Sequence, residues 1–216
     1  MPSPEDLEMS SVDGRTERAT RKRQDRRKAI LNAARRVFAD KGFHGTHVSD
    51  IIEAANIARG TFYLYFESKN AIFLELLEGL IAEVRESIVG VDTKEGAPPV
   101  QLQLAHTLRR VLATVVENRD LTRILVREAV GLGDDVDARL NTFYGNLLEY
   151  IRQALDNGQT MGILREQMDT HLASLCVLGT IKSFMEQLVM DEDRIGDDLD
   201  RMVVAVLDFN LRGLLK

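Results

Sequence analysis

Apolar positions recur three and four residues apart along most of the chain, whereas strict alternation of apolar and polar positions is absent. This spacing places apolar side chains on one face of a helix, so it predicts an all-α protein of about nine helices. Between Gly14 and the C-terminal residue, proline interrupts the pattern at one point only, positions 98 and 99. We expect an N-terminal three-helix unit followed by a helical body.

Three helices are predicted in the first third of the chain. The first covers about residues 22–41 and carries one apolar stripe, formed by Ile30, Ala33, Ala34, Val37 and Phe38. Gly42 is expected to end this helix, and Thr46 is expected to cap the second one. Asn56 suits a left-handed turn before a third helix over residues 59–66. Two short helices joined by a tight turn and packed on a longer helix form the helix-turn-helix motif.

The third predicted helix exposes more side chains than its own packing needs. Phe62 and Phe66 account for its buried positions. The partly or wholly outward positions are Arg59, Gly60, Thr61, Tyr63, Leu64 and Tyr65. Arginine pairs with guanine edges, threonine meets thymine methyl groups or phosphates, and tyrosine hydroxyls bind phosphates. This surface predicts contact with double-stranded DNA.

Charge is segregated along the chain. The net charge is −6, yet residues 15–69 hold 13 Lys or Arg and six Asp or Glu, which gives +7. Residues 1–14 carry −4 and residues 70–216 carry −9. A basic block beside an acidic body favours a polyanion as the partner of one end. A solvated, charged helix explains the charge alone equally well.

Composition excludes several classes of protein. With 216 residues, 44% hydrophobic and 29% charged, the chain suits a folded protein, and its single cysteine, Cys176, excludes an internal disulfide and a multi-cysteine zinc site. The longest charge-free apolar run, residues 170–181, is shorter than a membrane span. We expect a cytoplasmic protein with no membrane segment, metal or cofactor. Because no glycine-rich phosphate loop and no nucleophile–base pair is readable, we do not expect an enzyme.

Six further helices are predicted after the first three. They cover about residues 69–89, 100–118, 120–131, 134–158, 169–190 and 198–214. The last two have apolar surfaces broader than one monomer buries, which predicts a homodimer through these two helices. Two-fold symmetry then requires a near-palindromic operator.

Residues 30–77 read ILNAARRVFADKGFHGTHVSDIIEAANIARGTFYLYFESKNAIFLELL. This stretch, and above all R-G-T-F-Y-L-Y-F-E-S-K at residues 59–69, resembles the TetR/AcrR family of bacterial transcriptional regulators. By position, the resemblance implies that bases or the groove floor meet Arg59, Gly60 and Thr61. It implies that the DNA backbone meets Thr46, Tyr63, Tyr65 and Lys69.

Two positions depart from the family pattern. Ala58 stands where serine is common, so a capping hydroxyl is missing. Leu64 stands where histidine or another polar residue is frequent, so this position suits a thymine methyl group better than a phosphate. These departures alter which sequence is read rather than whether DNA is bound.

The resemblance also implies a cavity for a small apolar or amphipathic ligand in the body. The candidate ligand-binding residues are Leu112, Arg127, Phe143, Tyr144, Leu147 and Met185. Ordinary core packing remains an open alternative for each apolar residue of this set. The implied domains are a flexible arm over residues 1–19, a DNA-binding domain over 20–68 and a regulatory and dimerisation domain over 69–216.

Two hypotheses of function remain open beside an enzyme. The first is a homodimeric repressor that a ligand releases from its operator. The second is a DNA-binding protein without an inducer, which acts as a structural or protein-recruiting factor. The sequence also leaves open whether the segment before the first predicted helix contacts DNA; Arg15–Arg27 could lie along the backbone.

Overall fold

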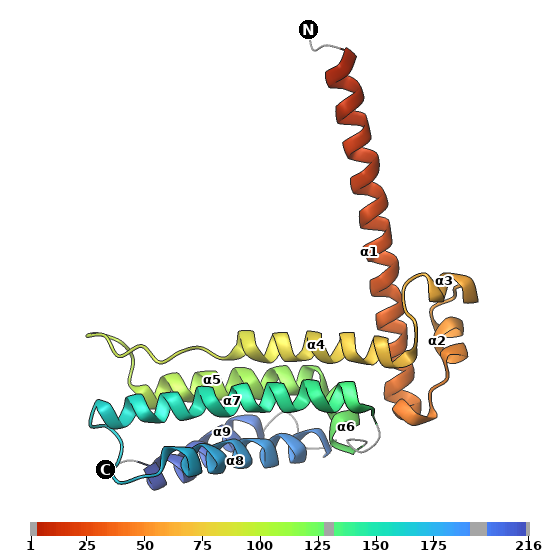
Figure 1. Ribbon diagram of the computed structural model, residues 1–216. Coiled ribbons are helices and arrows are strands. Elements are labelled where there is room, and N and C mark those ends of the chain that lie inside the picture. The colour runs from red at the N-terminus through yellow and green to blue at the C-terminus, as the bar shows by residue number, and fades with distance from the viewer. Residues whose placement is uncertain (1–3, 128–131, 191–197, 215–216) are drawn as a thin grey trace. The chain divides into compact units, whose positions relative to one another are not determined.

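The structure, a computed structural model, describes residues 4–127, 132–190 and 198–214, with side chains from residue 17 onward apart from Arg127 and Asp198. Within this described part the chain forms nine helices (Figure 1). Their bounds are α1 (Pro4–Gly45), α2 (Val48–Ala54), α3 (Arg59–Tyr63), α4 (Lys69–Ser87), α5 (Val100–Glu117), α6 (Arg119–Arg127), α7 (Asp134–Thr160), α8 (Thr170–Met190) and α9 (Asp198–Leu214). The prediction of an all-α protein is confirmed.

The chain divides into two compact units, Met1–Leu76 and Leu77–Lys216. The boundary therefore lies within α4 and not ahead of it, where the sequence places the edge of the DNA-binding domain. The physical reason is that the first turns of α4 complete the core of the first unit. Ile72 and Phe73 are buried, and the Phe73 ring lies edge-on to Phe38 with 5.8 Å between ring centroids.

The first unit has a small aromatic and aliphatic core. Ile30 and Phe38 of α1, Ile51 of α2 and Phe62 of α3 are each fully buried. The apolar stripe that the sequence places on the first helix is therefore its packed face. A positive φ of 71° at Gly42 breaks the α1 helix where the sequence expects the helix to end.

Helix α1 begins much earlier than the sequence pattern predicts. It starts at Pro4 rather than near residue 22, so the segment that we expected to be a flexible arm is helical from that point. Arg, Lys, Glu, Gln and Ala dominate residues 15–36, and all of these are good helix formers. An apolar stripe predicts only the part of a helix that packs against the core. It does not predict how far the helix extends beyond that part.

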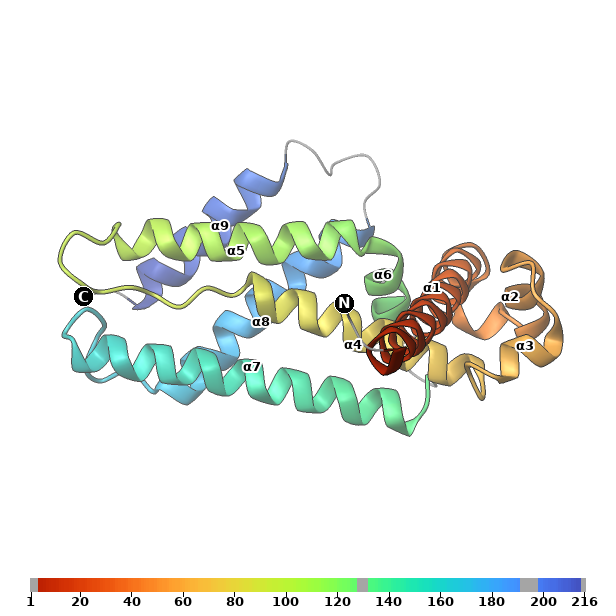
Figure 2. The ribbon, with the colours of Figure 1, turned by 90° about the horizontal axis from the view of Figure 1, so that it is seen from above.

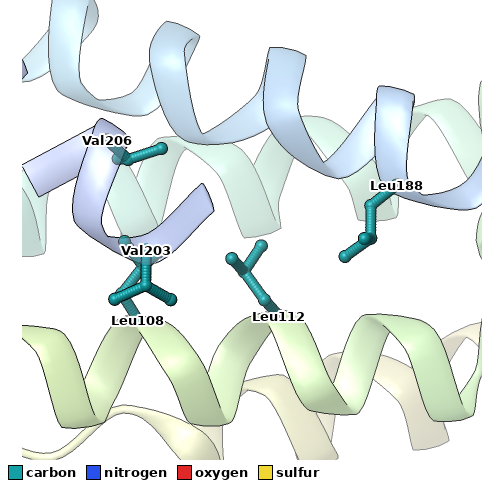
Figure 3. Close-up of a cluster of buried hydrophobic side chains, with 5 residues drawn as sticks. All are labelled: Leu108, Leu112, Leu188, Val203 and Val206. Carbon is teal, nitrogen blue, oxygen red and sulfur yellow. The ribbon is translucent and has the colours of Figure 1, made fainter. Parts of the chain in front are cut away.

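The second unit packs its helices around a core of aliphatic side chains. Helix α7 packs on α8, and α5 packs on both α8 and α9. Leu108 and Leu112 of α5 meet Leu188 of α8 and Val203 and Val206 of α9 in one buried cluster (Figure 3). The last two helices therefore each bury one face within the monomer.

Polar contacts join the second half of α4 to α5. The hydroxyls of Ser87 and Thr114 lie 2.7 Å apart, and the Asn118 side-chain amide donates to the Glu83 carboxylate at 2.6 Å. Ser87 and Asn118 are almost fully buried, so these bonds satisfy groups that water does not reach. Directional bonds therefore fix the register between α4 and α5.

One helix in the described part of the chain, α8, is long and apolar enough to cross a membrane when judged by length and composition alone. The charge-free run covers residues 170–181. The rest of α8 is also largely apolar, because Lys182 and Glu186 are its only charged residues. Only 17% of its most apolar window is buried within the unit. Helix α8 thus keeps a large apolar surface that the monomer leaves uncovered.

Candidate nucleic-acid interface and cavity

The start of α2 is set by His47 and Asp50. His47 occupies the N-cap position in an extended conformation, and its backbone N–H donates to the Asp50 carboxylate at 2.7 Å. This bond and the neighbouring Lys41 ammonium lower the pKa of Asp50 below its usual value. Asp50 also lies in the first helical turn, where a negative charge is favoured by the helix dipole.

The prediction that the Thr46 side chain caps α2 and contacts a phosphate is wrong. Thr46 is fully buried, and its hydroxyl donates to the Gly42 carbonyl at 2.6 Å. The N-cap of α2 is His47, one residue later than the sequence suggests, and Thr46 faces inward. Its role is to close the loop that follows α1.

The turn between α2 and α3 agrees with its sequence. Asn56 has a φ of 49°, the only positive φ of a non-glycine residue in the chain that the structure describes. Ala58 is the N-cap of α3, and no side chain caps the helix there, as the missing hydroxyl predicts. Because asparagine tolerates this left-handed conformation, the turn stays tight without glycine.

Helix α3 presents a short exposed surface. Phe62 is fully buried beneath it, whereas Leu64 is 74% exposed and Tyr63 48% exposed. Arg59 and Gly60 are also exposed, and Thr61 and Tyr65 are half-buried. A side chain added at Gly60 would meet no atom within 4 Å, so packing inside the protein does not require glycine there. The predicted DNA contacts at these positions stay predictions, on a surface that is accessible to a duplex.

An open groove of about 510 Å³ separates α2 from α3. Arg59 and Tyr63 line one side of it, and His47 and Ser49 line the other. His47 and Ser49 are exposed and carry groups that bind phosphates or base edges, yet neither is among the DNA contacts predicted from the sequence. Their position at the N-terminus of α2, next to the turn, is the signal that points to them.

Lys69 does not face outward as a phosphate anchor, contrary to expectation. Its ammonium group donates to the carbonyls of Phe43 and Thr46 at 2.8 Å each, and the His44 carbonyl lies 3.5 Å away. It also lies 4.6 Å from the centroid of the Phe43 ring. A lysine has three donors, and three carbonyls of the α1–α2 loop surround them. Lys69 therefore ties the start of α4 to that loop.

Arg27 likewise acts inside the first unit rather than on the basic face of α1. Its Nε donates to the Glu75 carboxylate at 2.9 Å, and its Nη1 donates to the Tyr65 carbonyl at 3.0 Å. The guanidinium carbon lies 4.4 Å from the centroid of the Phe66 ring. These contacts connect α1 to α4 and to the chain just after α3, and the bond to Glu75 raises the pKa of Arg27.

The second unit contains a large, mostly apolar cavity of about 980 Å³. Its walls come from the six helices α4 to α9; Figure 2 shows α5 and α7 on opposite sides of the unit. Four of the candidate ligand-binding residues line it: Phe143, Tyr144, Leu147 and Met185. A volume of this order holds a drug-sized or long-chain molecule.

Two candidate ligand-binding residues are not part of this cavity wall. Leu112 is fully buried in the cluster of α5, α8 and α9, so its expected role as a lining residue is wrong. It shares α5 with Leu108, which does reach the cavity. The side chain of Arg127 lies outside the described residues.

Three polar side chains, those of Tyr144, Lys182 and Glu186, lie together in the mostly apolar lining of the cavity. The Lys182 ammonium lies 5.3 Å from the centroid of the Tyr144 ring and 4.0 Å from the Glu186 carboxylate. Burial raises the pKa of the Tyr144 hydroxyl, and the charge of Glu186 raises it further. Tyr144 therefore stays neutral and can donate a hydrogen bond to a molecule in the cavity.

Helix α4 makes a larger contribution to the cavity than the candidate residues suggest. Leu77, Leu80, Ile81 and Val84 of this helix all line it. The sequence shows these residues as one apolar stripe, which is the pattern of any packed helix. The stripe cannot distinguish a helix that covers a core from one that covers a cavity.

The described residues contain no group of three or more His, Cys, Asp or Glu side chains that could hold a metal ion. The thiol of Cys176, on α8, is exposed and lies on the uncovered side of that helix.

Comparison with protein families identifies the first unit. Residues 30–76 match the model of bacterial regulatory proteins of the tetR family. These residues run from the packed face of α1 to the start of α4, and so contain the whole helix-turn-helix.

Comparison with curated proteins extends the similarity to both units. The chain is 28% identical over 191 residues to the HTH-type transcriptional regulator YdgC of Bacillus subtilis, covering 86% of this chain and 92% of the relative. It is 26% identical over 185 residues to the fatty acid metabolism regulator protein of the same organism, with 86% and 93% covered.

Solved structures show the same architecture. FadR from Bacillus subtilis, a transcriptional regulator solved in complex with stearoyl-CoA, has a TM-score of 0.67 and 25% identity, covering 86% of this chain and 98% of that chain. NalD, a repressor of a multidrug efflux pump in Pseudomonas aeruginosa, has a TM-score of 0.73 at 23% identity, covering 89% and 98%, and shows the fold alone. The helix-turn-helix, the helical body and these relatives together make this chain a DNA-binding transcriptional regulator that is similar over both units to regulators of the TetR family.

Proposed function

We propose that the chain is a homodimeric repressor that leaves a near-palindromic operator when an apolar or amphipathic molecule fills the cavity of the second unit. The observation that carries this proposal is the cavity of about 980 Å³ with α4 in its wall. Helix α4 is continuous from Lys69, which is tied to the α1–α2 loop, to the residues that line the cavity. A molecule that displaces α4 acts on the same helix that holds the helix-turn-helix unit together.

The cavity favours a ligand with a long apolar part and one polar end. Most of its lining is aliphatic or aromatic, and Tyr144, Lys182 and Glu186 form a polar group in it. The stearoyl-CoA bound by the FadR relative belongs to this chemical class, which makes long-chain acyl compounds the first ligands to test. The polar end would accept a hydrogen bond from Tyr144.

Dimerisation through α8 and α9 explains the apolar surface that each unit leaves uncovered. Leu172 and Leu175 of α8 are exposed, and Val204 and Phe209 of α9 are 67% and 72% exposed. Two copies of this surface would form a four-helix interface and place two helix-turn-helix units on one operator. The same pairing would cover α8 without a membrane, as expected for a cytoplasmic regulator.

Fluorescence anisotropy tests the regulatory part of this proposal. Wild-type protein bound to DNA from upstream of its own gene should be released by stearoyl-CoA or by an uncharged long-chain alcohol. By reciprocity, the DNA should weaken binding of the ligand by the same factor. Leu147→Trp, which fills part of the cavity, should keep DNA affinity and lose release by the ligand. Equal release of the wild type and of Leu147→Trp would refute the cavity as the regulatory site.

Sedimentation of a surface variant tests the dimer. Phe209→Glu places a charge on the exposed face of α9 and should give a monomer whose helix content by circular dichroism is unchanged. Ala82→Glu, at an exposed position of α4 and outside α8 and α9, introduces the same charge as the matched control and should remain dimeric. A wild-type protein that sediments as a monomer at micromolar concentration would contradict the proposal.

A further inference from the structure

The N-terminal half of α1 carries cations that the three-helix core does not use. From residue 17 to residue 29 every side chain except Arg27 is exposed. Arg27 is engaged by Glu75 and the Tyr65 carbonyl. The other cations of this segment are Arg18, Arg21, Lys22, Arg23, Arg26 and Lys28. None of these six has a hydrogen bond or ion pair to any other residue whose side chain the structure describes.

Four of these cations share one face of the helix. Arg18, Arg21, Lys22 and Arg26 follow the spacing i, i+3, i+4 and i+8, so they form a strip, here called the α1 strip. At 1.5 Å per residue the strip is about 12 Å long. Asp25 is the one acidic residue within it. Figure 1 shows α1 as a single rod that continues past α2 and α3, so the strip is not covered by the rest of the first unit.

We propose that the α1 strip binds DNA phosphates beside the base pairs that α3 reads, as a second and sequence-independent contact of each protomer. Along one DNA strand the phosphates recur every ~3.4 Å of helix axis, so a strip of about 12 Å matches about three of them. This inference rests on the DNA-binding function of the chain and adds a contact surface that lies outside the helix-turn-helix.

Charge and composition favour DNA over the other polyanions that such a strip could meet. The strip lies in the same compact unit as the helix-turn-helix. An anionic membrane would require an apolar face on the same helix. Residues 17–29 contain no apolar side chain larger than alanine, namely Ala19 and Ala29. The strip therefore has charge but nothing to insert into lipid.

Helix α3 itself makes this second contact useful. It contains one cation, Arg59, and its exposed residues are otherwise uncharged. Phosphate contacts supply most of the affinity of proteins for DNA, whereas base contacts supply the specificity. The α1 strip would thus raise affinity for any duplex, and α3 would select the operator.

The test is the salt dependence of binding by the full-length protein. Wild type and the variant Arg18→Gln/Arg21→Gln/Lys22→Gln/Arg26→Gln are titrated with an operator duplex from upstream of the gene and with a random duplex, between 50 and 200 mM salt. Glutamine keeps the helix propensity of arginine and lysine, so α1 should remain helical by circular dichroism. Each phosphate contact contributes about 0.9 to the slope of log affinity against log salt. Three lost contacts should lower the slope by about 3 for each bound protomer, and a fourfold rise in salt should then weaken the wild type about 40-fold more than the variant.

Two matched variants make the outcome decisive. Arg18→Lys/Arg21→Lys/Arg26→Lys keeps every charge and should keep the wild-type slope, whereas Asp25→Asn should tighten binding to both duplexes. An unchanged slope for the glutamine variant overturns the inference, as does a loss of affinity confined to the operator. A wild type that fails to prefer its operator would refute specific regulation instead, and the slope on random DNA would still decide the role of the strip.

Discussion

Lys69 offers a direct test of how the helix-turn-helix unit is held together. Its ammonium group donates to the carbonyls of Phe43 and Thr46 at 2.8 Å and lies over the Phe43 ring. Lys69→Met keeps the length of the apolar stem and removes all three donors. This change should loosen the loop before α2 without removing any contact to DNA.

The size of the effect follows from the bonds that are lost. Hydrogen bonds to a charged group contribute about 1.5–3 kcal/mol each, and Lys69 is only half-buried, so the lower value applies. Two bonds and a cation–π contact of about 0.5–1 kcal/mol give a loss of about 3–4 kcal/mol. For a unit of this size each kcal/mol lowers the melting temperature by about 4–8 °C. The transition of the first unit should therefore fall by more than about 10 °C.

Thermal melting and salt titration together distinguish this role from a phosphate contact. Lys69→Met should melt early, yet below its transition it should keep the wild-type salt slope on DNA. Lys41→Met removes an exposed partner of Asp50 in the same unit and is the control that should change melting little. A salt slope lowered by about 0.9 per protomer with unchanged melting would refute the loop-anchor assignment and restore Lys69 as a phosphate contact.

Three further predictions concern packing, titration and the turn. Leu112→Ala, which empties part of the buried cluster, should destabilise the second unit by about 2–5 kcal/mol in urea denaturation, whereas Phe143→Ala should weaken ligand binding with a smaller loss of stability. The folded state lowers the pKa of Asp50, so its stabilisation is present above the unfolded pKa of 3.8 and is lost as pH falls through the folded pKa; Asp50→Asn should remove this part of the acid dependence of melting. Asn56→Gly should leave stability nearly unchanged, but Asn56→Val should cost about 1–2 kcal/mol, because a β-branched residue resists a φ of 49°.

Sequence patterns predict the helices of this protein well because each helix buries an apolar stripe. The helix expected over residues 198–214 has these bounds in the structure, and α5 ends one residue before its expected end. The start of α1 is missed because residues 17–26 are all exposed, so no apolar stripe marks this part of the helix. A helical segment that does not pack on the core can be predicted only from the helix propensity and the charge pattern of its residues.

Individual side chains are harder to place because the sequence does not give their direction. Thr46 and Lys69 carry polar groups at positions where the family resemblance implies phosphate contacts, yet both bond to loop carbonyls. In α5, Leu108 reaches the cavity and Leu112, one turn later, does not. Apolar spacing is the same for both, so only the tertiary structure separates a wall of the cavity from the core.

Charge segregation and side-chain position together indicate how affinity and specificity divide within the first unit. Among the cations predicted to face DNA, Lys69 binds loop carbonyls and Arg27 binds Glu75, so both are withdrawn from the duplex. Among the described residues, the surface of α3 carries Arg59 with uncharged neighbours. The cations of the α1 strip have no partner among the side chains that the structure describes. Since the second half of the chain is acidic, it cannot supply the missing attraction. A protein built this way should bind operator and random DNA with similar salt slopes and should distinguish them through α3 alone.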